Sequence, residues 1–195
     1  TILVRKGVYK EKVVIPSWLQ NVEFIGESVE NTIITYDDHA NINKMGTFRT
    51  YTVKVEGNSI TFKNLTIENN AARLGQAVAL HTEGDKLVFI NCRILGNQDT
   101  IYTGVAGTRL YFVDCYIDGT TDFIFGPSTA LFENCEIRSK TNSYITAAST
   151  PKDIAVGYVF KNCRLTADPG VDKVYLGRPW RPYAATVFIN CEMGK

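Results

Sequence analysis

The sequence predicts an all-β protein built as a solenoid, in which the strands of successive coils stack in parallel. Three observations predict this class. A short strand motif recurs along the chain, its apolar residues alternate with the period of two typical of β-strands, and no stretch shows convincing 3.6-residue amphipathicity. Each recurrence corresponds to one coil of about 20–28 residues.

The recurring motif has the form Phe-x-Asn-Cys-x-Ile. Asp114 replaces Asn in one copy, and Leu65 replaces Cys in an early one. The steps between the phenylalanines are 27, 23, 20, 28 and 28 residues, for copies that contain Phe62, Phe89, Phe112, Phe132, Phe160 and Phe188. Leucine-rich repeats are the main competing architecture, but they need leucine at several fixed positions and a helix, and the sequence indicates neither.

Each copy contains one residue too many for a continuous strand. Leu87 and Phe89 are two apart, as are Cys92 and Ile94, whereas Phe89 and Cys92 are three apart. The chain must therefore bend between them without leaving the core. Asn and Asp tolerate the left-handed backbone region better than other non-glycine residues, and they occupy this bend as Asn91, Asp114, Asn134, Asn162 and Asn190. Rows of these side chains can also hydrogen-bond along the solenoid axis.

The cysteines are explained by the same repeat. Equivalent residues of stacked coils lie about 4.8 Å apart, so we expect an interior file of small apolar side chains, rather than disulfides, catalytic thiols or a zinc site. The odd count and the lack of any C-x-x-C pair agree with this expectation, which covers Cys92, Cys115, Cys135, Cys163 and Cys191.

Each coil needs at least one further strand. The candidates follow the Phe motif in each coil and alternate imperfectly. They are residues 76–80, 100–103, 122–125, 144–147 and 173–177.

The bulk composition is that of an ordinary globular protein. The chain has 195 residues, 45% of them hydrophobic, and a net charge of +1. This charge favours neither a nucleic acid nor an acidic membrane surface as partner. No apolar run approaches the ~18 residues of a membrane-spanning helix, and no secretory signal is visible.

The spacing of the repeats predicts that two carboxylates lie side by side. Asp99 lies ten residues after Phe89, and Asp122 lies ten residues after Phe112. Both therefore occupy the same phase of neighbouring coils. Like charges so close raise the pKa of one carboxyl group, which supplies an ionised nucleophile or base beside a protonated acid. The alternative is a pair of exposed loop aspartates, which the shared phase and the apolar residues after each aspartate disfavour.

Other residues could complete such a site. Gln98 and Gln76 could donate hydrogen bonds to a developing oxyanion without adding charge. Arg178 could hold one carboxylate ionised and oriented, and Trp180 could stack on a sugar face. The alternative for the last two is a surface arginine and a tryptophan that covers the side of the solenoid.

Other chemistries have weak support. The sequence lacks a G-x-S-x-G motif and has only two histidines, which disfavours a Ser-His-Asp esterase. His39 follows Tyr36-Asp37-Asp38 and is interpreted as part of a solvated loop. We find neither a dense carboxylate cluster for calcium nor a Gly-rich phosphate loop, and we expect no metal site.

At these residues the chain resembles the pectin methylesterase (pectinesterase) family. Each matching block is weak alone, but all five occur in family order and together span most of the chain. They are Gly7-Val8-Tyr9-Lys10-Glu11, Gln76-Ala77-Val78-Ala79-Leu80, Gly96-Asn97-Gln98-Asp99-Thr100, Asp122-Phe123-Ile124-Phe125-Gly126 and Leu176-Gly177-Arg178-Pro179-Trp180. The resemblance implies a right-handed parallel β-helix with a cleft on one long sheet and no metal or organic cofactor.

The resemblance also implies roles that spacing alone leaves open. Asp122 is similar to the nucleophile and Asp99 to the general acid, later base. Gln98 and Gln76 resemble the oxyanion donors, and Arg178 resembles the residue that bonds the nucleophile and helps to bind substrate. Contacts to the sugar chain are expected from Thr47, Tyr102, Phe125 and Trp180, besides Gln76 and Arg178.

We therefore expect an enzyme that demethylates pectin through an aspartyl acyl-enzyme, with a homogalacturonan chain as its partner. By the resemblance it is secreted or bound to the cell envelope, and we expect a monomer. Residues 1–195 are expected to form one β-helix domain that lacks the family's first coil and its carboxyl-terminal segment. A polysaccharide-binding β-helix without catalysis and a β-helix lyase or glycosidase are the alternatives.

Overall fold

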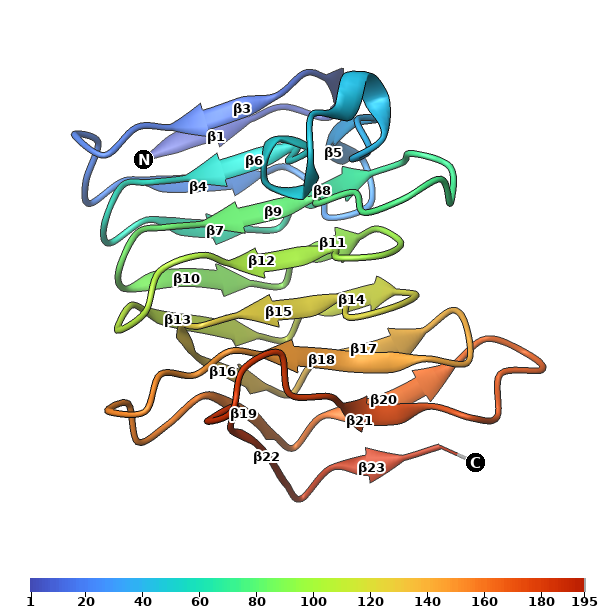
Figure 1. Ribbon diagram of the computed structural model, residues 1–195. Coiled ribbons are helices and arrows are strands. Elements are labelled where there is room, and N and C mark those ends of the chain that lie inside the picture. Colours follow the sequence, from blue (N-terminus) through green and yellow to red (C-terminus); the bar gives the residue numbers. More distant parts are fainter. Residues whose placement is uncertain (195) are drawn as a thin grey trace.

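The protein folds into three parallel β-sheets that form the sides of a solenoid (Figure 1). The computed structural model describes residues 1–194. The first sheet contains β1 (Ile2–Val4), β4 (Glu23–Gly26), β7 (Thr61–Lys63), β10 (Leu87–Ile90), β13 (Arg109–Val113), β16 (Thr129–Glu133), β19 (Tyr158–Lys161) and β22 (Thr186–Ile189).

The second sheet contains β2 (Gly7–Lys10), β5 (Thr32–Tyr36), β8 (Thr66–Asn69), β11 (Arg93–Leu95), β14 (Tyr116–Gly119), β17 (Glu136–Ser139), β20 (Arg164–Ala167) and β23 (Glu192–Met193). The third sheet contains β3 (Val13–Ile15), β6 (Val53–Val55), β9 (Leu80–Thr82), β12 (Ile101–Thr103), β15 (Ile124–Gly126), β18 (Tyr144–Ala148) and β21 (Tyr175–Gly177). Two short 3-10 helices, η1 (Ile42–Lys44) and η2 (Thr47–Arg49), lie between β5 and β6.

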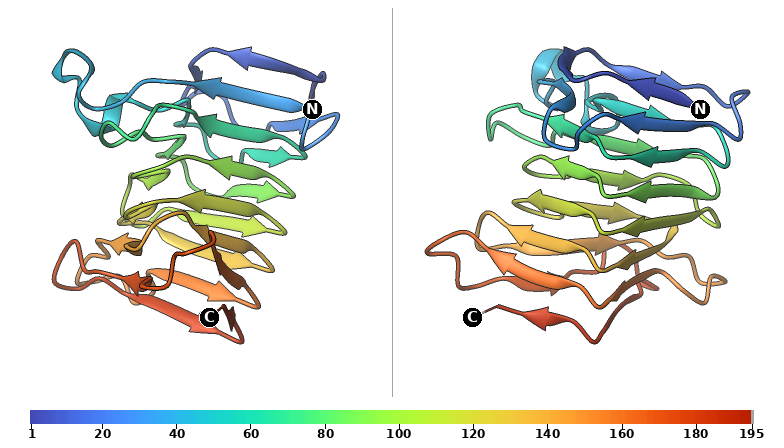
Figure 2. Two further views of the ribbon diagram at one scale, coloured as in Figure 1. Left: turned by 90° about the vertical axis from the view of Figure 1, so that its right-hand side faces the viewer. Right: turned by 180° about the vertical axis from the view of Figure 1, so that it is seen from behind.

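The predicted right-handed parallel β-helix is confirmed. Each strand from β1 to β20 pairs in parallel with the strand three places further along the chain. In Figure 1 the strands of the third sheet run to the left in front, those of the first sheet run to the right behind, and successive coils descend, which is a right-handed winding. Figure 2 shows from two further sides that the coils stack along one axis.

A column of stacked phenylalanine rings forms the centre of the core. Phe89, Phe112, Phe132 and Phe160 are each at most 2% exposed, and successive ring centroids lie 4.6–4.7 Å apart. This is the strand spacing of a sheet, so the repeat in the sequence becomes a repeat in space. Phe24 begins the column, 5.0 Å from Phe62, and sequence analysis missed it.

The bends follow the prediction. Asn64, Asn91, Asp114, Asn134, Asn162 and Asn190 all have φ between 48° and 55°. Asn91 donates a 2.9 Å hydrogen bond to Asn64, as expected for amides stacked along the axis. All five cysteines are free thiols, and the first four are buried. Their Sγ atoms donate to backbone carbonyls of the Phe motif, as an interior file requires.

The strands predicted after the Phe motif need correction. Residues 76–79 are not a strand, and β9 begins only at Leu80. Asp122 has φ 49°, so β15 begins at Ile124 rather than at Asp122. In the last complete coil the strand is shorter than residues 173–177 and begins at Tyr175. Among residues 1–194, no helix is long and apolar enough to cross a membrane.

Candidate active site

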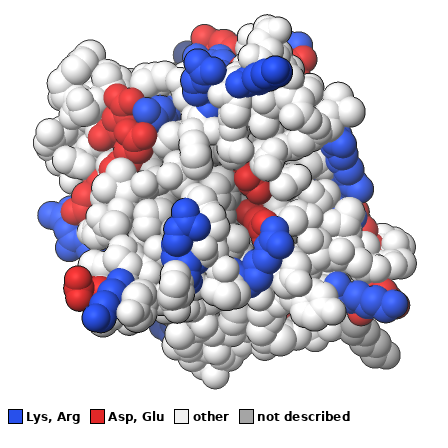
Figure 3. Space-filling model, in the orientation of Figure 1, with Lys and Arg blue, Asp and Glu red and all other residues white. Residues whose placement is uncertain are grey.

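A pocket of about 420 Å³ opens on the outer face of the third sheet. Figure 3 shows acidic and basic atoms meeting in a hollow near the middle of this face. The pocket is lined by Thr47, Phe48, Gln76, Gln98, Asp99, Asp122, Phe125, Ala147, Arg178, Pro179 and Trp180. It therefore brings together all five predicted catalytic residues and, of the predicted sugar contacts, all but Tyr102.

Asp99 and Asp122 hold equivalent places in neighbouring coils. Each lies two residues before one member of the paired residues Ile101 and Ile124. Asp99 has φ 67° and Asp122 has φ 49°, so both stand at left-handed bends. Their backbone N–H groups donate to the carbonyls of the next coil, Asp99 to Thr121 at 3.1 Å and Asp122 to Tyr144 at 2.8 Å. The stacking of the coils thus sets the position of both carboxyl groups.

Asp122 is held by a two-pronged ion pair with Arg178. Arg178 Nε donates to Asp122 Oδ1 at 2.9 Å, and Nη2 donates to Oδ2 at 2.5 Å. The guanidinium lies over the Tyr144 ring, 4.9 Å from its centroid, and the Arg178 backbone N–H is fixed on the Thr146 carbonyl. Such a fork fixes the orientation of the carboxylate.

Asp99, in contrast, lies in surroundings that favour the protonated carboxyl group. It is 8% exposed, and burial raises the pKa of its carboxyl group from 3.8 to about 8, with the Asp122 charge adding to the rise and Arg178 opposing it. Asp99 therefore keeps its proton at neutral pH beside an arginine-paired carboxylate. The prediction that one carboxyl group of the pair holds its proton more tightly agrees with this environment of Asp99.

The two glutamines line the pocket and are partly exposed. The Gln98 carbonyl accepts from the Ala77 N–H at 3.0 Å, and the Gln76 carbonyl accepts from the Ala40 N–H at 2.8 Å. These backbone hydrogen bonds fix the backbone positions of Gln76 and Gln98, from which the two amide side chains extend. Neutral amides beside the carboxylates can donate hydrogen bonds to a developing oxyanion.

The bend that carries Gln98 and Asp99 is anchored from two other coils. Asp118 Oδ1 accepts from the Gly96 N–H at 3.0 Å. Lys140 Nζ donates to the Gly96 carbonyl and lies 3.3 Å from Asp118 Oδ1. Sequence analysis missed Asp118 and Lys140, although Asp118 stands close before Asp122 in the repeat.

Aromatic side chains form one wall of the pocket. Trp180 is 37% exposed and packs against Phe125, with 5.8 Å between the ring centroids. Phe48, a residue of η2 that sequence analysis missed, also lines the pocket and lies on Tyr102 at 4.7 Å. Tyr102 itself is placed beneath Phe48 and beside Phe125 rather than in the lining. Its predicted contact with substrate would thus act through these two rings.

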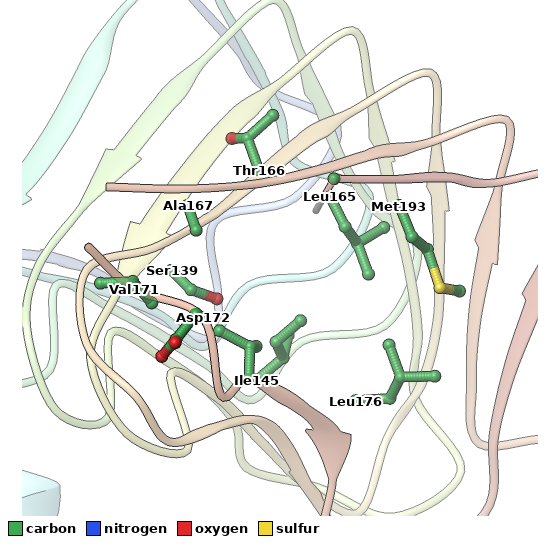
Figure 4. Close-up of a pocket in the computed structure, with 11 residues that line it drawn as sticks. Ser139, Ile145, Leu165, Thr166, Ala167, Val171, Asp172, Leu176 and Met193 are labelled. Carbon is green, nitrogen blue, oxygen red and sulfur yellow. The ribbon is translucent and has the colours of Figure 1, made fainter. Parts of the chain in front are cut away.

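A second pocket of about 250 Å³ lies at the last coils, between β17, β18 and β20 (Figure 4). Its lining is mainly apolar, with Ile145, Leu165 and Met193 pointing into it, and Asp172 is its one ionisable residue among those described. Within residues 1–194, no group of three or more His, Cys, Asp or Glu side chains could hold a metal ion. The paired carboxylates therefore mark the first pocket as the candidate active site.

A known protein family matches the chain. The family model described as Pectinesterase matches residues 1–195. The chain belongs to the pectinesterase family.

Solved pectin methylesterases share the fold closely. The enzyme from Yersinia enterocolitica is 34% identical with a TM-score of 0.92, over 98% of this chain and 73% of that one. A pectin methylesterase in complex with a hexasaccharide is 30% identical with a TM-score of 0.89, over 98% and 69%. Probable pectinesterase/pectinesterase inhibitor 23 of Arabidopsis thaliana is 38% identical over 97% of this chain and 35% of its own length. The chain thus spans about a third of the length of such curated relatives.

Four of the five pectinesterase sequence blocks meet at the pocket. They are the blocks that contain Gln76, Gln98, Asp122 and Arg178. The fifth, residues 7–11, includes β2 of the first coil and contributes nothing to the lining. The structure therefore brings four blocks together at one pocket, whereas the first block belongs to the scaffold.

Proposed function

We propose that this chain carries the catalytic centre of a pectinesterase that removes methyl esters from pectin and releases methanol. One observation carries the proposal: the buried Asp99 carboxyl group, with a pKa raised to about 8, stands beside the Asp122 side chain that Arg178 holds in place. A nucleophile and a proton donor are thereby supplied by two residues of the same type.

In the first half-reaction an Asp122 oxygen attacks the carbonyl carbon of the methyl ester. The side chains of Gln98 and Gln76 donate to the oxyanion of the tetrahedral intermediate, an effect of about 3–4 kcal/mol for a well-placed donor. The intermediate collapses by breaking the bond to the methoxy oxygen. Asp99 gives its proton to that oxygen, so methanol leaves and an acyl group remains on Asp122.

In the second half-reaction a water molecule attacks the acyl carbon. Asp99, now a carboxylate, takes a proton from the water. The bond between the acyl carbon and the Asp122 oxygen breaks, which releases the galacturonate carboxylic acid and restores both aspartates. Asp99 must be protonated in the first step, and a pKa raised to about 8 favours this near neutral pH. It is ionised in the second step because it has given that proton to methanol.

The proposed substrate is a homogalacturonan chain bound along the pocket. Trp180, Phe125 and Phe48 offer flat apolar surface to sugar rings, and Thr47 offers a hydroxyl group. The related pectin methylesterase solved with a hexasaccharide supports this proposal. We further propose a secreted monomer in which residues 1–195 form one domain.

The test is methanol release from highly methylated pectin by the protein that carries this chain. Asp122→Asn and Asp99→Asn should each lower the rate by at least about 100-fold, the scale of a lost acid–base group, while circular dichroism stays unchanged. Asp153→Asn, at an exposed aspartate outside the pocket, is the matched control and should keep the rate. Wild-type turnover in either pocket variant would refute these roles. Pectin binding without methanol release by the wild type would favour a binding β-helix instead.

A further inference from the structure

Two tyrosines continue the column of residues to which the paired aspartates belong. In the third sheet, β15, β18 and β21 follow one another along the axis (Figure 1). Ile124 of β15 pairs with Thr146 of β18. Two residues before this pair, Asp122 and Tyr144 therefore occupy the same position of neighbouring coils. Tyr144 in turn pairs directly with Tyr175 of β21. The position that holds a carboxyl group in one coil thus holds an aromatic ring in each of the next two.

Arg178 has to cross this column to reach Asp122. It follows directly after β21, and β18 lies between β21 and β15. The arginine side chain therefore bridges two strand spacings of about 4.8 Å each. Its path leads across the coil of Tyr144, where the guanidinium carbon lies over the ring, 4.9 Å from the centroid. From there Nε and Nη2 reach the two carboxylate oxygens of Asp122.

A side chain that reaches so far needs a surface to lie on. The Arg178 side chain is 51% exposed, whereas that of Asp122 is only 11% exposed. An exposed arginine has many rotamers, and an ion pair that is open to water holds only weakly. An aromatic ring attracts a guanidinium to its face, because the ring quadrupole is negative there. The Tyr144 ring can therefore restrict the arginine to the rotamers that reach Asp122.

The Tyr144 ring is itself supported by the next coil. The Tyr175 ring stacks on it with 5.1 Å between the centroids and 27° between the planes. The Tyr144 carbonyl accepts from the Asp122 N–H at 2.8 Å, and the Tyr175 N–H donates to the Ser143 carbonyl at 2.9 Å. These bonds tie the three coils together at the column. Tyr175 is 58% exposed, so the two stacked rings lie at the surface and not in the core.

We propose that Tyr144, backed by Tyr175, is a positioning residue for the ion pair between Arg178 and Asp122. Its ring carries the guanidinium across one coil, so that both prongs of the fork meet the carboxylate and fix its orientation. Among residues 1–194, Arg178 is the one basic residue of the pocket lining, so no other side chain of the lining replaces it when it swings away. Tyr144 acts through its aromatic ring, because the ring faces both Arg178 and Tyr175.

The first test needs no substrate. Nitrogen NMR of the arginine Nε–H groups reports how firmly Arg178 is held, and Arg178→Lys identifies its signal. Tyr144→Leu should speed hydrogen exchange of this Nε–H by roughly fivefold, because the guanidinium then leaves Asp122 more often. Tyr144→Phe should keep the slow exchange, and Tyr175→Leu should give a smaller rise. Wild-type exchange in Tyr144→Leu, or fast exchange in Tyr144→Phe, would overturn the proposal. An unchanged rate in Tyr175→Leu would refute the supporting role of Tyr175.

The second test rests on the proposed function. Tyr144→Leu should lower kcat for methanol release by about tenfold with circular dichroism unchanged, because a misplaced nucleophile reacts slowly even when substrate is bound. Tyr144→Phe should recover most of this loss.

Tyr116→Leu is the matched control for the kinetic test. The Tyr116 ring lies in the second sheet beneath Arg93, with 5.5 Å between the guanidinium carbon and the ring centroid, and its loss should leave kcat unchanged. A wild-type kcat in Tyr144→Leu would overturn the proposal, and so would equal losses in Tyr144→Leu and Tyr144→Phe. A wild type that releases no methanol would refute the proposed function, and the exchange rates would still decide the role of Tyr144.

Discussion

Replacement of Asp99 by Asn should stabilise the fold, and increasingly so as the pH rises. The native protein holds the Asp99 carboxyl group buried with a pKa of about 8, against an ordinary value of 3.8 in an unfolded chain. Asn has nearly the same shape, stays neutral at every pH, and tolerates the φ of 67° at this bend. The variant therefore removes the ionisation while keeping the backbone geometry.

The sign and size of the effect follow from proton linkage. Between pH 4 and pH 8 the unfolded chain has released the Asp99 proton and the native state still holds it. The free energy of unfolding therefore falls as the pH rises through this window, by about 1.4 kcal/mol per unit at most. Below pH 4 both states are protonated and the contribution disappears. With relaxation around a buried group, we expect Asp99→Asn to be more stable than the wild type by ~3–5 kcal/mol at pH 8 and by nearly nothing at pH 4.

Urea denaturation at pH 4, 6 and 8 measures this difference directly. Asp153→Asn serves as control, because this aspartate is exposed and its substitution should leave the pH dependence unchanged. A gap between Asp99→Asn and wild type that is the same at all three pH values would refute the assignment of the raised pKa to Asp99. The outcome does not depend on activity, so it tests the electrostatics of the pair separately from its chemistry.

Three further predictions concern the site and its scaffold. Gln98→Ala should lower kcat for methanol release by about 100- to 1,000-fold with little change in KM, since it removes an oxyanion donor; an equal rise in KM would assign Gln98 to substrate binding instead. Lys140→Met should lower kcat by about tenfold, because the Gly96 carbonyl loses the ammonium group that anchors the Gln98 bend, and an unchanged kcat would contradict that anchoring role. Phe132→Ala should lower the free energy of unfolding, measured by urea denaturation, by ~3–5 kcal/mol, because it leaves a cavity in the middle of the ring column. A decrease below ~1 kcal/mol would show that the column contributes little to stability.

The scaffold could be predicted because its core repeats at every turn. In the repeat, Phe89 stacks on its neighbours, Asn91 forms the bend and Cys92 fills the interior, and most coils use the same residue types for these roles. The coil of Phe24 escaped prediction because Gly26 stands where other copies have Asn. A β-carbon at position 26 would lie only 2.2 Å from the backbone carbonyl oxygen of Asn64, so this coil needs glycine there.

The pairing of Asp99 with Asp122 could be predicted for the same reason, because residues at the same position of successive repeats become lateral neighbours in the stack. The place of Phe48 in the pocket could not be predicted. Residues 37–52 form a long connection between β5 and β6, and its path has no counterpart in the other coils. The strand predicted at residues 76–80 was wrong at its start. The Ala77 N–H donates to the Gln98 carbonyl and the Ala79 N–H to the Thr100 carbonyl of the next coil. These residues therefore pair like a strand, although the strand itself begins only at Leu80.

The same backbone geometry serves structure at one corner of the coil and chemistry at another. At the Phe motif, left-handed bends carry Asn or Asp and keep the apolar residues inside. At the pocket, Asp99 and Asp122 take the same left-handed conformation, and the ~4.8 Å spacing of coils brings two carboxyl groups to one place. A loop would relax to separate them, whereas a bend that is hydrogen-bonded to the coil beneath it cannot. The stacking of the coils therefore does more than stabilise the fold, because it holds the Asp122 side chain beside the buried Asp99 carboxyl group, whose pKa is raised.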